Sequence, residues 1–446
     1  MSVNKKTEQL DAVSGDWPML QALVGGTGAM RKAGKEFLPQ WPGEDDQSYK
    51  ERLAVAVLHP AFKRTCFVMG AKPFSRPMNV TAPDAVSALF EDVDNQGTPL
   101  SAYAAGLMFS CLSMGMTGVL VEYPKANGIR TKQEEQQAGV RPYFATYQAQ
   151  SILGWRADRN GLTMLRLMES VEEQDGLYGT QTVEQVRVLK RGKWEIWRPG
   201  ATKDDEWVLH DKGVTTISRI PFVFFYGNRL AFGVGQSPLL DLAFQNVEHW
   251  QSASDQQTIL HVARVPILFA KGFGDATITI GASKAASTEN TDADLTFVEH
   301  TGASIESGRN ALLDLEDRMR ATGAELISVK ASSNITATQI NSEDDGNKST
   351  LQAITEAFEE SLEAALNLIA EWLGVEQTAE VELYKDFSIA TDSDPETLNT
   401  ARDAGVISRE THFEELQRRD IVSPDRSWED EKKRLTGEMP VKVDEQ

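Results

Sequence analysis

Cysteine is scarce in this chain, which has only Cys66 and Cys111 among its 446 residues. Neither belongs to a CxxC pair or to another zinc-ligand spacing, and two cysteines are too few for a disulfide framework. We therefore expect a protein of a reducing compartment.

Long apolar runs are also missing. No stretch of the sequence approaches the ~18 consecutive apolar residues that a membrane span needs. The opening residues, MSVNKKTEQLDAVSGDWP, contain no apolar core of the kind found in secretory signals. We expect the chain to be cytosolic, in a bacterium or in a virus-infected one.

The motifs of the common enzyme classes are absent from the sequence. It has no GxxxxGK(S/T) phosphate loop, no HExxH zinc motif and no GxSxG nucleophile elbow. The glycine-rich stretch 25–28 lacks a preceding strand and a third glycine, so it is typical of a loop. The acidic clusters 44–46 and 343–345 lie in polar turns, where nothing would shift a carboxyl pKa toward catalysis. The sequence therefore predicts no catalytic residues and no cofactor.

Histidine is sparse, and its spacing matches no metal-ligand motif. The six histidines are His59, His210, His249, His261, His300 and His412. His249 and His261 are expected on one helix, but they are too far apart along it to share an ion. We expect every histidine to be structural and predict no metal site.

The charge balance is strongly acidic: 45 Lys and Arg against 66 Asp and Glu give a net charge of −21. Duplex DNA is normally bound by Lys and Arg that neutralise phosphates, so a simple DNA-binding module is disfavoured. Two interpretations remain open. The charge can serve solubility alone, or it can provide a surface past which DNA slides without adhering.

Periodicity predicts an α+β chain whose first 60 residues are helical. A small-residue helix over 99–116 should lead into a buried strand at 117–123, and the polar segment 125–140 should be a surface loop. Further strands are expected between glycine and aspartate turns. Those strands are 144–147, 152–156, 162–168, 183–189, 194–197 and 221–226.

The second half of the chain is predicted to be mostly helical. Ser237 and Pro238 are good residues for a helix start, so we expect a long, half-polar helix over 237–263. Helices are also expected at 306–327 and 348–373, and two short ones over 395–436. Three short strands, at 266–270, 276–280 and 295–299, should form a small insert that contains a loop at 281–293. A small and polar loop is expected at 331–346.

This order of elements resembles that of the portal proteins of tailed phages, and several local stretches strengthen the likeness. The N-terminal stretches 29–46 (AMRKAGKEFLPQWPGEDD) with Tyr49, Arg52 and Leu53, 61–65 (AFKRT) and 72–77 (KPFSRP) look like the signature of one portal subfamily. Weaker likenesses occur at 235–239 (GQSPL), 264–268 (RVPIL) and 405–411 (GVISRET).

The resemblance implies a multi-domain portal fold with a mixed wing, a helical stem, a small β-containing clip, a long kinked wing helix and a helical crown. The implied domains are an N-terminal wing at 1–232, a first stem helix at 233–265, a clip at 266–303, a second stem helix at 304–328, a tunnel loop at 329–347, a wing helix and return strand at 348–390, and a crown at 391–446.

The resemblance also implies a function. Portal proteins form a ring, generally of twelve subunits, at one capsid vertex of the virion, through which double-stranded DNA is packaged and ejected. The implied partners are the large terminase subunit, a head–tail adaptor, and the major capsid and scaffolding proteins. The clip residues expected to dock them are Ile267, Phe269, Lys271 and Phe273.

The tunnel loop is expected to touch DNA without reading its bases. Its residues are short hydrogen-bond donors with one cation among them, and such groups can contact a phosphate weakly and release it. An ordinary exposed linker is the competing interpretation. The expected contact residues are Lys330, Ser332, Ser333, Asn334, Thr336, Thr338, Gln339 and Asn341.

Two other functions stay open. Another ring-forming connector or adaptor of the virion is one, although adaptors are usually shorter. A soluble acidic enzyme of the glycoside hydrolase type is the other, and it would need two suitably spaced carboxylates. Gel filtration separates a ring from a 49.3 kDa monomer.

Overall fold

The computed structural model describes residues 3–124, 140–200, 207–263, 267–272, 292–298, 303–327, 348–387, 395–418, 422 and 426–438. The chain divides into two compact units, Met1–Lys385 and Asp386–Gln446. Within the described residues no helix is long and apolar enough to cross a membrane. Three expected elements fall almost wholly outside these residues: the loops at 125–140 and 281–293 and the strand at 276–280.

The N-terminal region is helical, as predicted. Its elements are α1 (Glu8–Ser14), α2 (Trp17–Gly25), α3 (Thr27–Ala33), α4 (Asp46–Val55) and α5 (Ala61–Ala71), with short 3-10 turns at Gly34–Glu36 and Lys72–Phe74. Asp45 caps α4 by accepting hydrogen bonds from the backbone N–H groups of Gln47 and Ser48, at 2.9 and 3.0 Å. α4 ends at Val55, and Pro60 lies directly before α5, where its missing N–H removes no hydrogen bond of the helix.

A three-stranded antiparallel sheet forms the centre of the first unit. β2 (Met116–Glu122) lies between β3 (Tyr143–Gln148) and β9 (Phe222–Tyr226), with Val119 opposite both Thr146 and Val223. α7 (Leu100–Met114) and α11 (Thr350–Leu373) pack against this sheet, so β2 is buried on both faces. Gly115, at φ +86°, makes the left-handed turn from α7 into β2.

A second sheet follows in the chain. It has five antiparallel strands in sequence order: β4 (Ile152–Asp158), β5 (Gly161–Asp175), β6 (Gly179–Lys190), β7 (Lys193–Arg198) and β8 (Val208–Val214). Leu153, Val186 and Val188 form its apolar core. The predicted strands of this region are confirmed, and β5 and β6 extend further than their apolar runs because the outer residues pair across an exposed ribbon.

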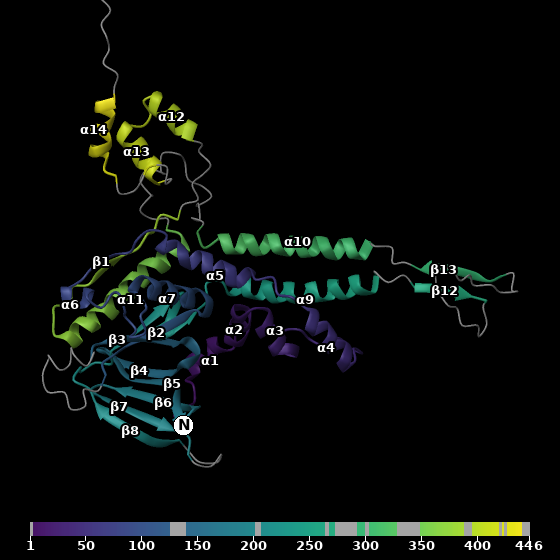
Figure 1. Ribbon diagram of the computed structural model, residues 1–446, viewed down its shortest axis with the longest axis horizontal. Coiled ribbons are helices and arrows are strands. Elements are labelled where there is room, and N and C mark those ends of the chain that lie inside the picture. Colours follow the sequence, from purple (N-terminus) through teal and green to yellow (C-terminus); the bar gives the residue numbers. More distant parts are fainter. Residues whose placement is uncertain are drawn as a thin grey trace, which may run out of the picture. The chain divides into compact units, whose positions relative to one another are not determined.

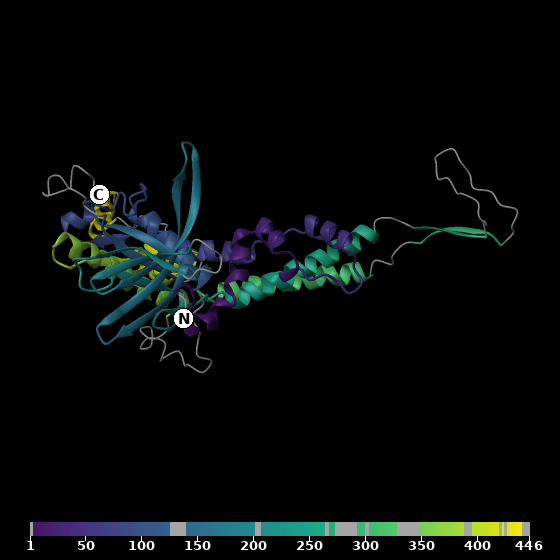
Figure 2. The same cartoon turned by 90° about the horizontal axis from the view of Figure 1, so that it is seen from below.

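A long helical hairpin leaves this body. α9 (Leu240–Ala263) and α10 (Ala303–Ala324) run side by side in both views (Figure 1, Figure 2). Between them in the chain, β12 (Ile267–Lys271) pairs with β13 (Asp294–Val298) in an antiparallel ribbon. A small β-ribbon, β10 (Asn228–Ala231) with β11 (Val234–Gln236), precedes the hairpin.

The start of α9 differs from the prediction by three residues. The Ser237 hydroxyl donates to the Leu112 carbonyl at 2.6 Å and accepts from the Leu239 N–H at 3.2 Å. It therefore fastens the chain to the end of α7, and residues 238 and 239 form a turn before the helix begins at Leu240.

α11 matches its predicted span closely. Ser349 and Gln352 form a reciprocal capping box at its start, and Gly374 ends it in the left-handed conformation. After it, β14 (Glu380–Glu382) pairs with β1 (Asn79–Thr81), and the Glu359 carboxylate on α11 accepts the Leu383 N–H at 2.6 Å. A short helix, α6 (Asp84–Ser87), also contacts α11.

The described residues of the second unit form three helices, so the prediction of two over 395–436 is wrong. They are α12 (Pro395–Asp403), α13 (Arg409–Arg418) and α14 (Trp428–Glu438). Gly405, at φ +71°, breaks the first expected helix, and the Ser408 hydroxyl caps α13. Phe413 packs on Trp428 at a ring-centroid distance of 5.4 Å. The described residues are mixed α and β, which is consistent with the expected α+β class.

Candidate functional site: the helical hairpin and its clamps

α9 and α10 pack side by side, and each carries buried apolar residues. Leu242, Ala243 and Trp250 of α9 are buried, as are Leu315 and Met319 of α10. Ala243 and Trp250 lie seven positions apart and Leu315 and Met319 lie four apart, so each pair shares one side of its helix. A direct bond between the two helices joins the Gln245 amide to the Thr322 hydroxyl at 3.2 Å.

Several polar side chains of α9 form hydrogen bonds with other segments of the chain. The fully buried Asn246 accepts from the Phe62 N–H at 2.9 Å and donates to the His59 carbonyl at 2.8 Å. Gln256 donates to the Ile305 carbonyl at 2.8 Å, and Gln251 donates to the Phe37 carbonyl at 3.0 Å. The half-polar pattern thus reflects clamps to α5, α10 and the α3–α4 connection, and does not by itself indicate a wet channel wall.

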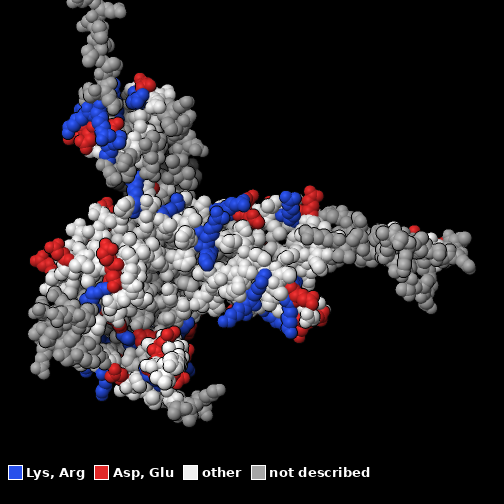
Figure 3. Space-filling view, viewed as in Figure 1, with Lys and Arg blue, Asp and Glu red and all other residues white. Residues whose placement is uncertain are grey.

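The hairpin carries charges of both signs, which include the exposed Arg309 of α10. α9 has Asp241, Glu248 and Asp255 and contains no Lys or Arg. On α10, Arg320 pairs with Asp317 and Glu316, and Arg318 lies 3.9 Å from Glu248. On the face drawn in Figure 3, basic and acidic side chains are interspersed along the hairpin and form no single basic patch.

A buried arginine clamps the turn before α4 to α9. Arg52 forms two 2.8 Å bonds to the two carboxylate oxygens of Glu44, and these side chains are only 4% and 6% exposed. Its guanidinium also donates to the Pro39 carbonyl at 2.8 Å and stacks 4.1 Å from the Trp41 ring centroid. A contact of 3.5 Å to the Ser254 hydroxyl reaches α9. The stretch that carried the portal resemblance is therefore a structural clamp.

The electrostatics of this clamp follow from its geometry. The hydrogen bonds from Arg52 hold the pKa of Glu44 below its usual value, against the opposing effect of burial. The same bonds raise the pKa of Arg52. Nearby Asp255 of α9 has its pKa raised by burial. The clamp is therefore a tight ion pair at neutral pH.

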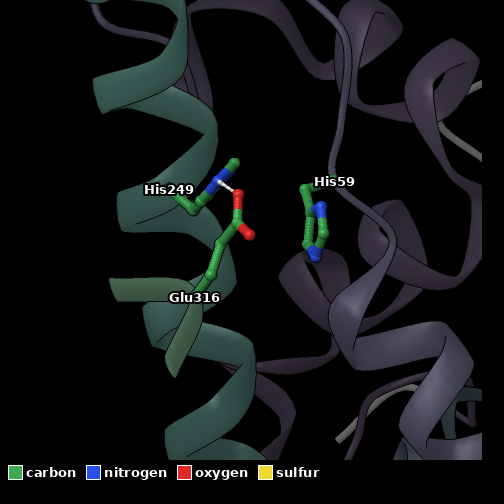
Figure 4. A group of neighbouring side chains, drawn as sticks. All are labelled: His59, His249 and Glu316. Carbon is green, nitrogen blue, oxygen red and sulfur yellow. Dashed lines mark hydrogen bonds and ion pairs between the residues drawn. The ribbon is translucent and has the colours of Figure 1, made fainter. Parts of the chain in front are cut away.

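A histidine and carboxylate group lies where the hairpin meets the α4–α5 connection. His249 of α9 is buried, Glu316 of α10 is half-buried and His59 is exposed, and one ligating atom from each lies within 4.8 Å of the others. His249 Nε2 is 3.4 Å from a Glu316 carboxylate oxygen, and the two imidazole rings are 5.0 Å apart (Figure 4). Burial lowers the pKa of His249. Spacing rules missed this group because its members come from three separate segments.

The predicted docking and channel residues are only partly within the described residues. Ile267 lies opposite Val298 in the β12–β13 ribbon, and Phe269 and Lys271 are exposed on it. Phe273 and all eight predicted channel residues, from Lys330 to Asn341, lie outside the described residues. Their roles stay predictions.

A second charged network lies between the two large sheets. Arg187 is ion-paired with Glu122 and Glu169, and the Glu169 carboxylate also accepts from Tyr147 at 2.5 Å and from Gln185 at 2.7 Å. Burial lowers the pKa of Arg187 to about 10. These two carboxylates are therefore engaged in structural pairs and are poorly placed to act as a catalytic pair on a sugar.

A cavity of about 650 Å³ lies elsewhere, and no carboxylate is among its lining residues. Its lining residues are Gln9, Trp155, Arg156, Ala157, Thr163, Ala231, Phe232 and Val234. It offers no general acid or base of the kind that the hydrolase alternative would need.

A family model described as a domain of unknown function, DUF4055, matches residues 238–373, which span α9, α10 and α11. No curated protein matches the sequence.

Several solved structures are similar to this chain at 13% identity. The neck of an empty gene transfer agent (GTA) particle, computed with C6 symmetry, has a TM-score of 0.40 and covers 86% of this chain and 91% of that chain. The virion of the native GTA particle has a TM-score of 0.39, with 92% and 99% covered, and its neck with C12 symmetry has a TM-score of 0.38, with 79% and 88% covered.

Proposed function

We propose that this chain is a portal-type ring subunit of a tailed phage, through which double-stranded DNA enters and leaves the capsid. The observation that carries the proposal is the helical hairpin: two long helices joined through a small β-ribbon and fastened at their base to a mixed α/β body. This arrangement matches the stem and clip that the portal resemblance implies.

In this proposal the remaining elements take portal roles. The body up to residue 232 is the wing, α9 and α10 are the stem, and β12 and β13 belong to the clip at 266–303. α11 is the wing helix, the segment 329–347 is the tunnel loop, and the second unit is the crown.

Ring formation would cover apolar side chains that a monomer leaves in water. Phe67 and Val68 of α5, Phe244 of α9 and Leu313 of α10 are all exposed. A head-to-tail interface repeated around a closed ring pairs one surface of each subunit with a different surface of the next. Such closure, with twelve subunits in the usual portal, would remove these side chains from solvent.

The charge of the hairpin fits passage of DNA. A wall without Lys or Arg on α9 makes few contacts that release counterions, so it would not trap the phosphate backbone. The predicted loop residues between Lys330 and Asn341 would supply weak phosphate contacts. Terminase, and afterwards a head–tail adaptor, would dock on the clip, with capsid and scaffolding proteins around the wing.

Electron microscopy of the purified full-length chain tests the proposal, with native mass measurement beside it. We expect rings with a central hole and a mass that is a multiple of 49.3 kDa, formed without nucleotide. A monomer at every concentration tested, or an open filament, would contradict the proposal.

A further inference from the structure

We propose that His59, His249 and Glu316 bind one zinc ion, which would tie both helices of the hairpin to the connection between α4 and α5. This role is independent of ring formation, because all three side chains belong to one protomer.

The spacing of the donor atoms fits zinc. Tetrahedral zinc binds histidine nitrogen and carboxylate oxygen at about 2.0–2.1 Å, which places two ligand atoms about 3.3 Å apart. His249 Nε2 and the Glu316 Oε1 atom are already 3.4 Å apart. The third donor belongs to the exposed His59 and lies within 4.8 Å of both.

The distribution of hydrogen bonds also favours a ligand at this point. The 3.4 Å contact between His249 Nε2 and the Glu316 carboxylate is long for a hydrogen bond. The Glu316 Oε2 atom faces Arg320 at 3.4 Å, so Oε1 is the oxygen left for a metal.

The backbone that carries His59 is fixed from both sides. Asn246 of α9 donates to the His59 carbonyl at 2.8 Å. Arg31 donates to the Ala56 carbonyl at 2.8 and 3.0 Å, and the Leu58 N–H donates to the Thr27 hydroxyl at 3.1 Å. Groups that orient a ligand in this way strengthen metal binding, so the site is held in position before the ion arrives.

Two nitrogens and one carboxylate oxygen form a donor set suited to zinc, and water would complete four-fold coordination. Zinc would then fix the inclination of the hairpin against the body. Because the ion acts inside a protomer, a chelator should lower thermal stability without dissolving the oligomer.

Calorimetric titration of the full-length, chelator-stripped protein with zinc chloride tests this site. The two informative variants are His59→Ala and Glu316→Gln. His59 is exposed, so its replacement should leave the fold intact. His261→Ala, an exposed histidine on the same helix, is the matched control. We expect one zinc per chain, binding at least about tenfold weaker in both ligand variants and unchanged in the control.

Thermal unfolding provides a second readout. Added zinc should raise the midpoint of the wild type and the control, and should leave His59→Ala unchanged. No saturable site, or equal zinc affinity in the wild type and His59→Ala, would overturn the inference, whatever oligomer the protein forms.

Discussion

Replacing Glu44 with Gln should destabilise the first unit strongly. The variant keeps the size of the side chain but removes the carboxylate to which the buried Arg52 guanidinium is hydrogen-bonded. A Gln oxygen can accept one of the two 2.8 Å bonds, while its amide hydrogens face a second guanidinium N–H. Breaking a buried ion pair on one side typically costs about 3–5 kcal/mol. That is a large share of the ~5–15 kcal/mol by which domains are stable.

Asp46→Asn is the matched control in the same turn. Its carboxylate lies 3.5 Å from Lys35, but these side chains are 80% and 59% exposed. Exposed pairs contribute less than about 1 kcal/mol, so the control should unfold like the wild type. Urea unfolding followed by circular dichroism gives the free energy, and hydrogen exchange of α4 locates the change.

The loss in Glu44→Gln should also depend on pH. Because the folded pKa of Glu44 is lowered, its contribution is complete above the unfolded value of about 4.3. It is lost as the pH falls through the folded pKa. The difference between wild type and variant should therefore shrink in acid. A variant within 1 kcal/mol of the Asp46→Asn control at pH 7, or a difference that does not shrink in acid, would refute the reasoning.

Three further changes test other parts of the chain. Gly115→Ala forces a residue with φ +86° against the backbone of Ser237, so it should cost more than about 1 kcal/mol in urea unfolding, whereas Gly106→Ala, with open space around it, should not. Phe269→Asp, on the exposed β12, should lower virion yield while circular dichroism stays unchanged; full yield would contradict a docking role for the ribbon. Deletion of residues 333–341 should leave rings intact but shorten the genome measured per particle, and full-length genomes would identify the segment as an ordinary linker.

Local patterns in the sequence were sufficient for most of the secondary structure. Apolar runs between turns predicted β2 and β9, and an apolar stripe ending at Gly374 predicted α11, because these signals depend on neighbours within one strand or one turn. The same local view failed at Gly405, where a left-handed glycine divides one expected helix into two. The roles given to the loop at 331–346 stay predictions.

The site was decided by tertiary structure. The sequence by itself determined that α9 is long and half-polar. It did not show that the Asn246 and Gln256 side chains form hydrogen bonds with other segments of the same chain. Spacing also could not bring His59 to His249 and Glu316, which are contributed by a connection and two different helices. Periodicity reports which face of an element is apolar. Which distant elements share that face depends on long-range packing, and therefore only the folded chain shows the Arg52 clamp and the histidine–carboxylate group.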